Sequence, residues 1–159
     1  MSQIEAKLNA MGYQLPPPFT FPKNNRTGCT QMGSLLLLSG HGLELPPLPD
    51  VRQTGKFGVD ITLEEGHATA RAVALTMLAT IKAHCGDLDR VKRVLRLFGM
   101  CNCVPDCVQH PQIIDGASDL FFELWGPEFG KHARTAVGQV SLPRGIAVEI
   151  NGEFELHVD

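Results

Sequence analysis

The sequence lacks several features that mark large classes of protein. Its formal charge is −3, without the basic excess that lets a general nucleic-acid binder displace counterions. No run approaches the ~20 apolar residues of a membrane span, and the longest aliphatic run, Leu35 to Leu38, fits a buried strand. Glu5 and Lys7 argue against an export signal, and the glycine-rich residues 54–58 lack phosphate-loop spacing. These absences predict a cytoplasmic protein without membrane or general nucleic-acid partners.

Cysteine is present in an odd number, five, in a chain whose 43% apolar content is enough for a core without disulfides. We therefore expect free thiols. Cys101, Cys103, Cys107 and His110 form a Cys-x-Cys-x3-Cys-x2-His pattern, and such side chains bind zinc. The spacing matches no standard structural zinc motif, and Cys101 and Cys103 can pack as small hydrophobic residues on one strand face. We expect no metal and no other cofactor, although metal binding remains an open alternative.

Apolar periodicity and turn residues predict one α+β domain over residues 1–159, in which residues 1–23 form an N-terminal helix and a proline-rich extension. Helices are expected where capping residues precede an apolar stripe: from Ser2 to about Met11, from Thr62 to about Gly86, and from Pro111 to Trp125. Strands are expected at residues 34–39 and 90–103, and as a pair within residues 133–150. An exposed loop is expected at Pro46, Pro47 and Pro49.

These elements would leave one face of a mixed sheet uncovered. The two main helices can cover one face, and the first helix is too short to cover the other. Association with further copies of the chain would bury that face, so we expect a homo-oligomer.

The strand pair at residues 133–150 carries the candidate site. If Leu142 to Gly145 is a tight turn, Gly138 lies opposite Glu149 and Arg134 shares their face, about 13 Å away. A guanidinium fork can grip a carboxylate, and a glutamate can move protons or position water. The hypothesis needs Arg134 to point into a shared pocket, free of any internal salt link. The alternative is a strand face with two solvated charges.

A family resemblance rests on the same segment. Arg134 to Gly138, Leu142-Pro143, Gly145 and Val148 to Ile150 resemble the C-terminal signature of the Rid family, the YjgF-like reactive-intermediate deaminases once labelled L-PSP endoribonucleases. Leu38-Ser39-Gly40 is similar to the early strand and Ser-Gly bend of that family, and residues 87–94 resemble its helix-to-strand passage. The similarity covers about residues 25–158. The N-terminal helix and prolines resemble a longer branch.

The resemblance implies a chorismate-mutase-like fold and a homotrimer with ligand clefts between subunits. It implies that Arg134 binds the substrate carboxylate and that Glu149 positions or activates water. Backbone at Ser39 and Gly40 would line the cleft from the neighbouring chain. The implied reaction is hydrolysis of 2-imino acids and their enamine tautomers to 2-keto acids and ammonia, without a cofactor.

Three cleft positions depart from the family pattern. The common cleft cysteine falls at Ala136, the aromatic of the neighbouring chain near Arg26, and the amide of the last helix near Asp115. A cleft aspartate would repel an anionic substrate, although Arg26 could offset it. Two alternatives therefore stay open: an enzyme, or a non-catalytic protein that binds or senses a small carboxylate.

An endoribonuclease is a further alternative, suggested by the older family label. It would use the basic strand residues Arg90, Lys92, Arg93 and Arg96. No aromatic residues interleave with these charges, so bases would have no stacking platform. We expect the charges to be solvated or paired with acids.

Overall fold

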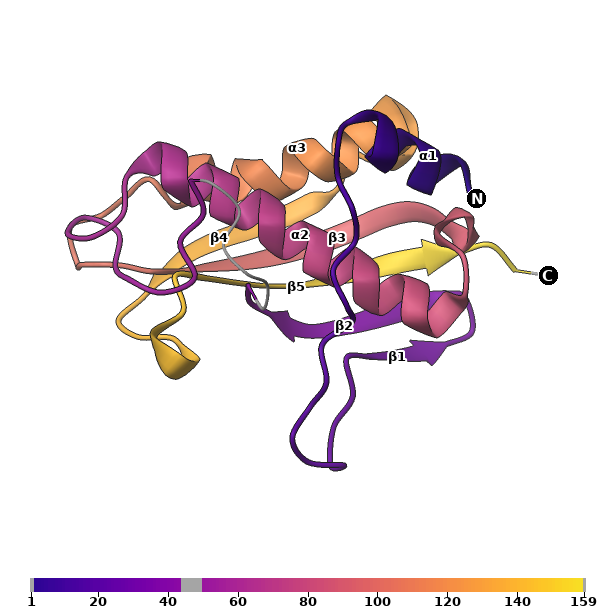
Figure 1. Cartoon of the computed structure of the whole chain (residues 1–159), viewed down its shortest axis with the longest axis horizontal. Helices are drawn as coiled ribbons and strands as arrows, with labels where there is room; N and C mark the ends of the chain where they lie inside the picture. The colour runs from indigo at the N-terminus through magenta and orange to yellow at the C-terminus, as the bar shows by residue number, and fades with distance from the viewer. Residues whose placement is uncertain (1, 44–49, 159) are drawn as a thin grey trace.

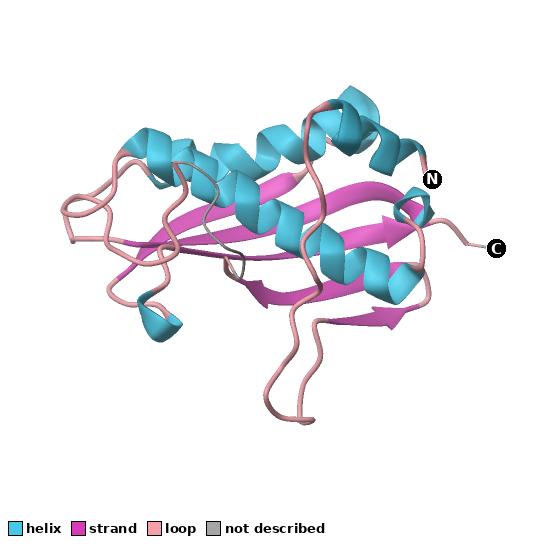
Figure 2. Cartoon of the chain, viewed as in Figure 1, coloured by secondary structure: helices cyan, strands magenta, loops and turns pink. Residues whose placement is uncertain are grey.

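The computed structural model describes residues 2–43 and 50–158, in which two long helices lie across one side of a five-stranded sheet (Figures 1 and 2). The helices are α1 (Gln3–Ala10), α2 (Leu63–Cys85) and α3 (His110–Phe129), with short 3-10 turns at Leu88–Arg90 and Pro143–Gly145. The strands are β1 (Cys29–Met32), β2 (Leu35–His41), β3 (Val91–Asn102), β4 (Ala133–Gln139) and β5 (Val148–Leu156). The predicted α+β class is confirmed. The loop prolines at 46, 47 and 49 lie outside the described residues.

The first two helices begin at the caps that the sequence predicted. At the start of α2, the Glu65 backbone N–H donates to Thr62 Oγ1 at 3.1 Å, and the Thr62 N–H donates to Glu65 Oε2 at 2.9 Å. This reciprocal pair satisfies two backbone donors that the helix itself cannot. At the start of α1, Ser2 Oγ accepts from the Glu5 N–H at 3.1 Å.

Helix α3 runs further than expected and packs closely on α2. Pro111 lies in its first turn, and Gly126, with a φ of 75°, interrupts it before a last turn that ends at Phe129. A Cβ atom at Gly116 would lie 1.9 Å from the His67 carbonyl oxygen of α2. Glycine at this position therefore lets the two helix backbones approach each other.

The sheet order, β1-β2-β5-β3-β4, corrects the predicted hairpin. β3 pairs with β4 in parallel and with β5 in antiparallel, so it separates the two C-terminal strands. Gly138 lies opposite Cys101 and Glu149 lies opposite Met100. Residues 133–150 therefore form two strands that never pair with each other.

The two faces of the sheet differ sharply. The face under α2 and α3 carries the core, which includes fully buried Leu97, Ile150 and Phe154. On the other face, which no described helix covers, Met32 is 72% exposed and Leu37 is 37% exposed. The mixed sheet with helices on one face is as expected, and cover by further copies of the chain stays a prediction.

Candidate functional site

Arg134 lies on the edge strand β4 and points toward the helices, because its partner across the ladder is Leu97 of the buried face. Its Nη1 is 2.7 Å from Asp115 Oδ1 of α3 and donates to Ser118 Oγ at 3.1 Å, while Nη2 donates to the Pro111 carbonyl at 3.3 Å. The Arg134 side chain is 21% exposed and that of Asp115 is 48% exposed. The expectation of a guanidinium free of internal ion pairs is therefore wrong for the single chain.

Glu149 lies on β5 and belongs to the opposite face of the sheet, since it pairs with Met100 rather than with a core position. Its carboxylate fills the space beside Gly40, where a Cβ atom would lie 2.0 Å from Oε1. Burial raises the pKa of Glu149, and the nearby Arg144 opposes this with a smaller effect. A carboxyl group with a raised pKa keeps its proton to a higher pH than a free one, as groups that transfer protons in enzymes often do.

The prediction that Arg134 and Glu149 share one face of the sheet is therefore also wrong. β3 lies between the two strands, and the two side chains leave the sheet on opposite sides. Within one chain these two groups cannot hold the two ends of one small molecule.

Gly40 and Glu149 line a cavity of about 190 Å³ between the N-terminal extension, the end of β2 and the turn before β5. Arg26 lies on its wall, with the guanidinium carbon 5.3 Å from the centre of the Phe21 ring. Arg144 also lines this cavity. Two arginines and one carboxyl group thus surround a space of the size of a small acid.

The Ser-Gly bend beside this cavity is held by three hydrogen bonds, of which the one between His41 and Thr80 is buried. Ser39 Oγ donates to the Thr27 carbonyl at 2.6 Å. His41 Nδ1 lies 2.6 Å from the Ser39 carbonyl, which can only accept, so Nδ1 carries the proton. His41 Nε2 then accepts from Thr80 Oγ1 at 2.7 Å, and burial lowers the pKa of His41, which favours this neutral form.

The seven predicted site residues thus separate into two groups. Arg134, Asp115 and Ala136 lie together where β4 meets α3, and Arg134 and Asp115 line a cavity of about 290 Å³. The second group, Glu149, Gly40, Ser39 and Arg26, lies in and beside the 190 Å³ cavity. Asp115 pairs with Arg134, whereas Arg26, which could have offset its charge, lies in the second group.

Sequence reasoning missed several residues of both groups. Ser118 contacts Arg134 from the next turn of α3, while Phe19, Phe21 and Arg144 line the Glu149 cavity. A helical spacing of three from Asp115 could have indicated Ser118. The other three lie in irregular segments, where no periodic pattern indicates which way a side chain points.

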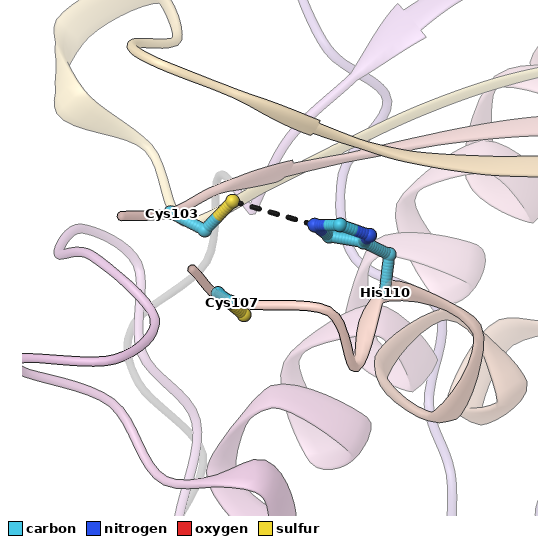
Figure 3. Close-up of side chains that lie close together, drawn as sticks. All are labelled: Cys103, Cys107 and His110. Atoms are coloured by element: carbon cyan, nitrogen blue, oxygen red, sulfur yellow. Dashed lines mark hydrogen bonds between the residues drawn. The ribbon is translucent and has the colours of Figure 1, made fainter. Parts of the chain in front are cut away.

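The cysteine-histidine pattern is partly brought together. Single ligand atoms of Cys103, Cys107 and His110 all lie within 4.8 Å of one another (Figure 3). Cys101 is not a member of this group; it is fully buried beneath the helices, and burial raises its pKa to about 12. All five cysteines are free thiols.

The basic residues of β3 are paired with acids of β5. Lys92 and Arg93 both contact Glu155, at 2.9 Å and 3.1 Å, and Arg96 contacts Glu153 at 2.7 Å. The expectation that these charges pair with acids is confirmed, which leaves them less available to phosphates.

Comparison with known proteins identifies the family. Residues 5–148 match the model described as "YjgF/chorismate mutase-like, putative endoribonuclease". The chain therefore belongs to the YjgF/chorismate mutase-like family, as the signature around Arg134 and Glu149 indicated. No helix within residues 2–43 and 50–158 is both long and apolar enough to cross a membrane.

Relatives match almost end to end. Protein TCP17 of Trypanosoma cruzi is 39% identical over 98% of this chain and 95% of its own length. A crystal structure from Agrobacterium tumefaciens, of unknown function, is 35% identical with a TM-score of 0.86, covering 97% of this chain and 92% of that one. A putative endoribonuclease from Shewanella oneidensis is 34% identical with a TM-score of 0.88, covering 98% and 100%.

Proposed function

We propose that the protein binds a small 2-imino or 2-keto acid in a cleft between subunits and hydrolyses reactive imines and enamines to 2-keto acids and ammonia. Family membership supports the class of function. The observation that carries the proposal is the wall of the 190 Å³ cavity, where Glu149, with its raised pKa, lies with Arg26 and Arg144.

Assembly would bring the two separated charged groups together. Arg134 lies on an edge strand, and the uncovered sheet face exposes apolar side chains that another copy would bury. In a homotrimer, the Arg134 group of one subunit would meet the Glu149 group of the next. One cleft would then hold a cation for the substrate carboxylate and a carboxyl group for proton transfer.

The chemistry needs only these groups and water. A guanidinium has five N–H donors, and the described contacts of Arg134 use three of them, so donors remain for a substrate carboxylate. Glu149 takes a proton from water as the oxygen attacks the C=N carbon, and returns a proton to the departing nitrogen. The imine plus water becomes the ketone plus ammonia.

A non-catalytic carboxylate-binding protein is the second candidate, favoured by the Arg134–Asp115 ion pair and by Ala136 at the cysteine position. Asp115 competes with a ligand carboxylate for the same cation. An ion pair with a carboxylate this exposed is worth on the order of 1 kcal/mol, or about fivefold in affinity. Asp115→Asn should therefore tighten pyruvate binding by up to about fivefold in calorimetry.

Asp119→Asn is the matched control, because Asp119 lines the same cavity but pairs with His67 at 3.1 Å. Equal affinities for Asp115→Asn and wild type would show that Asp115 does not compete for the ligand.

The test of turnover generates 2-iminopropionate with an amino-acid oxidase and follows its loss with and without the protein. We expect wild type to accelerate the loss, and Arg134→Lys and Glu149→Gln not to, because lysine keeps the charge without the fork. Binding without acceleration would select the non-catalytic candidate. Unchanged turnover in Arg134→Lys and Arg134→Ala would refute the role of Arg134.

The family description and the Shewanella relative also name an endoribonuclease. In this chain Lys92, Arg93 and Arg96 are already paired with acids, so the alternative has no free basic strip on β3. RNA cleavage that Arg96→Ala abolishes and Glu149→Gln spares would favour it.

A further inference from the structure

We propose that Cys103, Cys107 and His110 bind a soft divalent metal ion, with Zn²⁺ the best match, and leave one coordination position open. The inference is independent of the imine chemistry. It departs from the expectation of no metal because the fold selects three of the four candidate residues and places their ligand atoms within 4.8 Å of one another.

The distances fit a tetrahedral ion. With Zn–S near 2.3 Å and Zn–N near 2.0–2.1 Å, two ligand atoms of a tetrahedral site are roughly 3.5–3.8 Å apart. Cys103 Sγ and His110 Nε2 are 3.5 Å apart, with the ring nitrogen aimed at the sulfur (Figure 3). Cys107 Sγ, within 4.8 Å of both, needs to move by only about 1 Å to complete the third edge.

Backbone hydrogen bonds anchor Cys103 and Cys107, and His110 begins a helix. Cys103 directly follows β3, and its N–H donates to the Gln139 carbonyl at the end of β4, at 3.0 Å. Cys107 closes a turn, since its N–H donates to the Val104 carbonyl at 3.1 Å. His110 is the first residue of α3. Because the residues are already held in place, metal binding loses less conformational entropy in ordering them.

Gly138 leaves the space in which the cluster forms. A Cβ atom there would lie 2.5 Å from His110 Nε2 and 2.6 Å from Cys103 Sγ. Both are side-chain atoms that can turn away, so an alanine would displace ligand atoms without forcing the backbone to move. Glycine at this position of β4 thus keeps the imidazole and the thiol next to each other.

The charge balance and the surroundings indicate the class of ligand. Two thiolates neutralise a divalent ion, and thiolate with imidazole is a donor set that selects zinc over magnesium or calcium. The cluster lines a cavity of about 320 Å³ together with Gly138 and Gln139. Three protein ligands with an open fourth position characterise zinc sites that bind water or a small anion.

The experiment uses the full chain with a histidine-free tag, purified under reducing conditions. Metal is first removed with a chelator, and one equivalent of Zn²⁺ is then added. Bound metal is measured by elemental mass spectrometry, and the affinity for Zn²⁺ is measured by competition with a chromophoric chelator. We expect one ion per chain, and Cys103→Ser, Cys107→Ser and His110→Ala should each weaken binding at least about 100-fold. Co²⁺ in place of Zn²⁺ should give the absorption of a tetrahedral, thiolate-bound ion.

Two further variants test the proposal even if substitutions of the metal-binding residues impair folding. Cys85→Ser removes a partly exposed thiol outside the cluster and should leave affinity unchanged. Gly138→Ala keeps all three ligands and should weaken Zn²⁺ binding at least about tenfold with a nearly unchanged melting temperature. Equal affinity in wild type, Gly138→Ala and the ligand variants would overturn the proposal. A Cys103–Cys107 disulfide, with no Zn²⁺ bound by the reduced protein, would overturn it too.

Discussion

Two inactive variants should recover activity when their subunits assemble together. Arg134→Ala lacks the cation and Glu149→Gln lacks the proton-transfer group, so each homo-oligomer should be inactive in the imine assay. The two residues leave opposite faces of one chain, so a productive cleft would take one residue from each of two neighbours. In a mixed ring, some clefts combine the intact Arg134 of one variant with the intact Glu149 of the other.

The size of the recovery follows from the arrangement. In a ring of identical heterologous contacts, each cleft draws its cation from one subunit and its carboxyl group from the next. With equal amounts of the two variants mixed at random, half of the subunits keep Arg134 and half of their neighbours keep Glu149. About one quarter of the clefts are then intact, so turnover should reach about one quarter of wild type.

The assay co-expresses the variants with different tags and purifies only assemblies that carry both. Every such trimer has one intact cleft of three, whichever variant is present twice, so this selection raises the expected turnover from about one quarter to about one third of wild type. The control mixes wild type with the double variant, which carries both substitutions, and is measured without selecting mixed assemblies. It leaves about one quarter of sites intact if each site spans two subunits, but about one half if each site lies within one chain. No recovery from the mixed variants, with half activity in the control, would refute the intersubunit cleft. If wild type binds the ligand without turnover, the fraction of intact clefts can be read from the number of ligands bound per assembly in calorimetry.

Further predictions concern the stability and geometry of the same fold. Because burial raises the folded-state pKa of Glu149 above its ordinary 4.5, the folded chain holds this proton to higher pH and loses stability as pH rises through that window. The melting temperature of Glu149→Gln should therefore gain on that of wild type as pH rises above about 4.5, and a difference that stays constant with pH would contradict this. Gly40→Ala should push the Glu149 carboxylate away and lower turnover at least about tenfold, with little loss in urea stability. Gly116→Ala should destabilise by at least about 2 kcal/mol despite its better helix propensity, because the contact is with backbone; a neutral result in urea unfolding would contradict the close helix approach.

Local signals predicted the helices well, because caps act over one turn. The Thr62–Glu65 box and the apolar stripe after it fix α2 from neighbouring residues alone. β1 gave no such signal, since only Cys29 among its four residues is buried. An edge strand with one buried side chain has no alternation to detect.

Strand order was beyond local signals. Strands adjacent in sequence usually pair, which favoured a hairpin of β4 and β5. The chain between β4 and β5 instead crosses β3. Two hydrogen bonds hold this connection: the Ala147 N–H donates to the Gln53 carbonyl at 3.0 Å, and the Gly55 N–H donates to the Gly145 carbonyl at 3.1 Å. These partners are about 90 residues away in the sequence, so no pattern within residues 133–150 could reveal them.

The sequence singled out Arg134 and Glu149 as candidate site residues, but it did not predict what surrounds them. Arg134 was identified from its place on a strand, whereas its salt link depends on which side of α3 faces β4. Asp115 reaches Arg134 because the neighbouring Ile113, Ile114 and Ala117 are buried and set the rotation of the helix. The rotation of α3 is thus set by packing, and this rotation determines that Asp115 pairs with the Arg134 guanidinium.

The Arg134–Asp115 pair is too exposed to act as an off switch. With side chains 21% and 48% exposed, it contributes on the order of 1 kcal/mol, which a carboxylate ligand with its own hydrogen bonds can exceed. Asp115 can therefore weaken ligand binding without preventing it. Ala136 offers no polar side chain beside Arg134, and it lies on the opposite face of the sheet from Glu149. The distinction between an enzyme and a binding protein then falls on Glu149, because only the proposed hydrolysis needs its carboxyl group to transfer a proton.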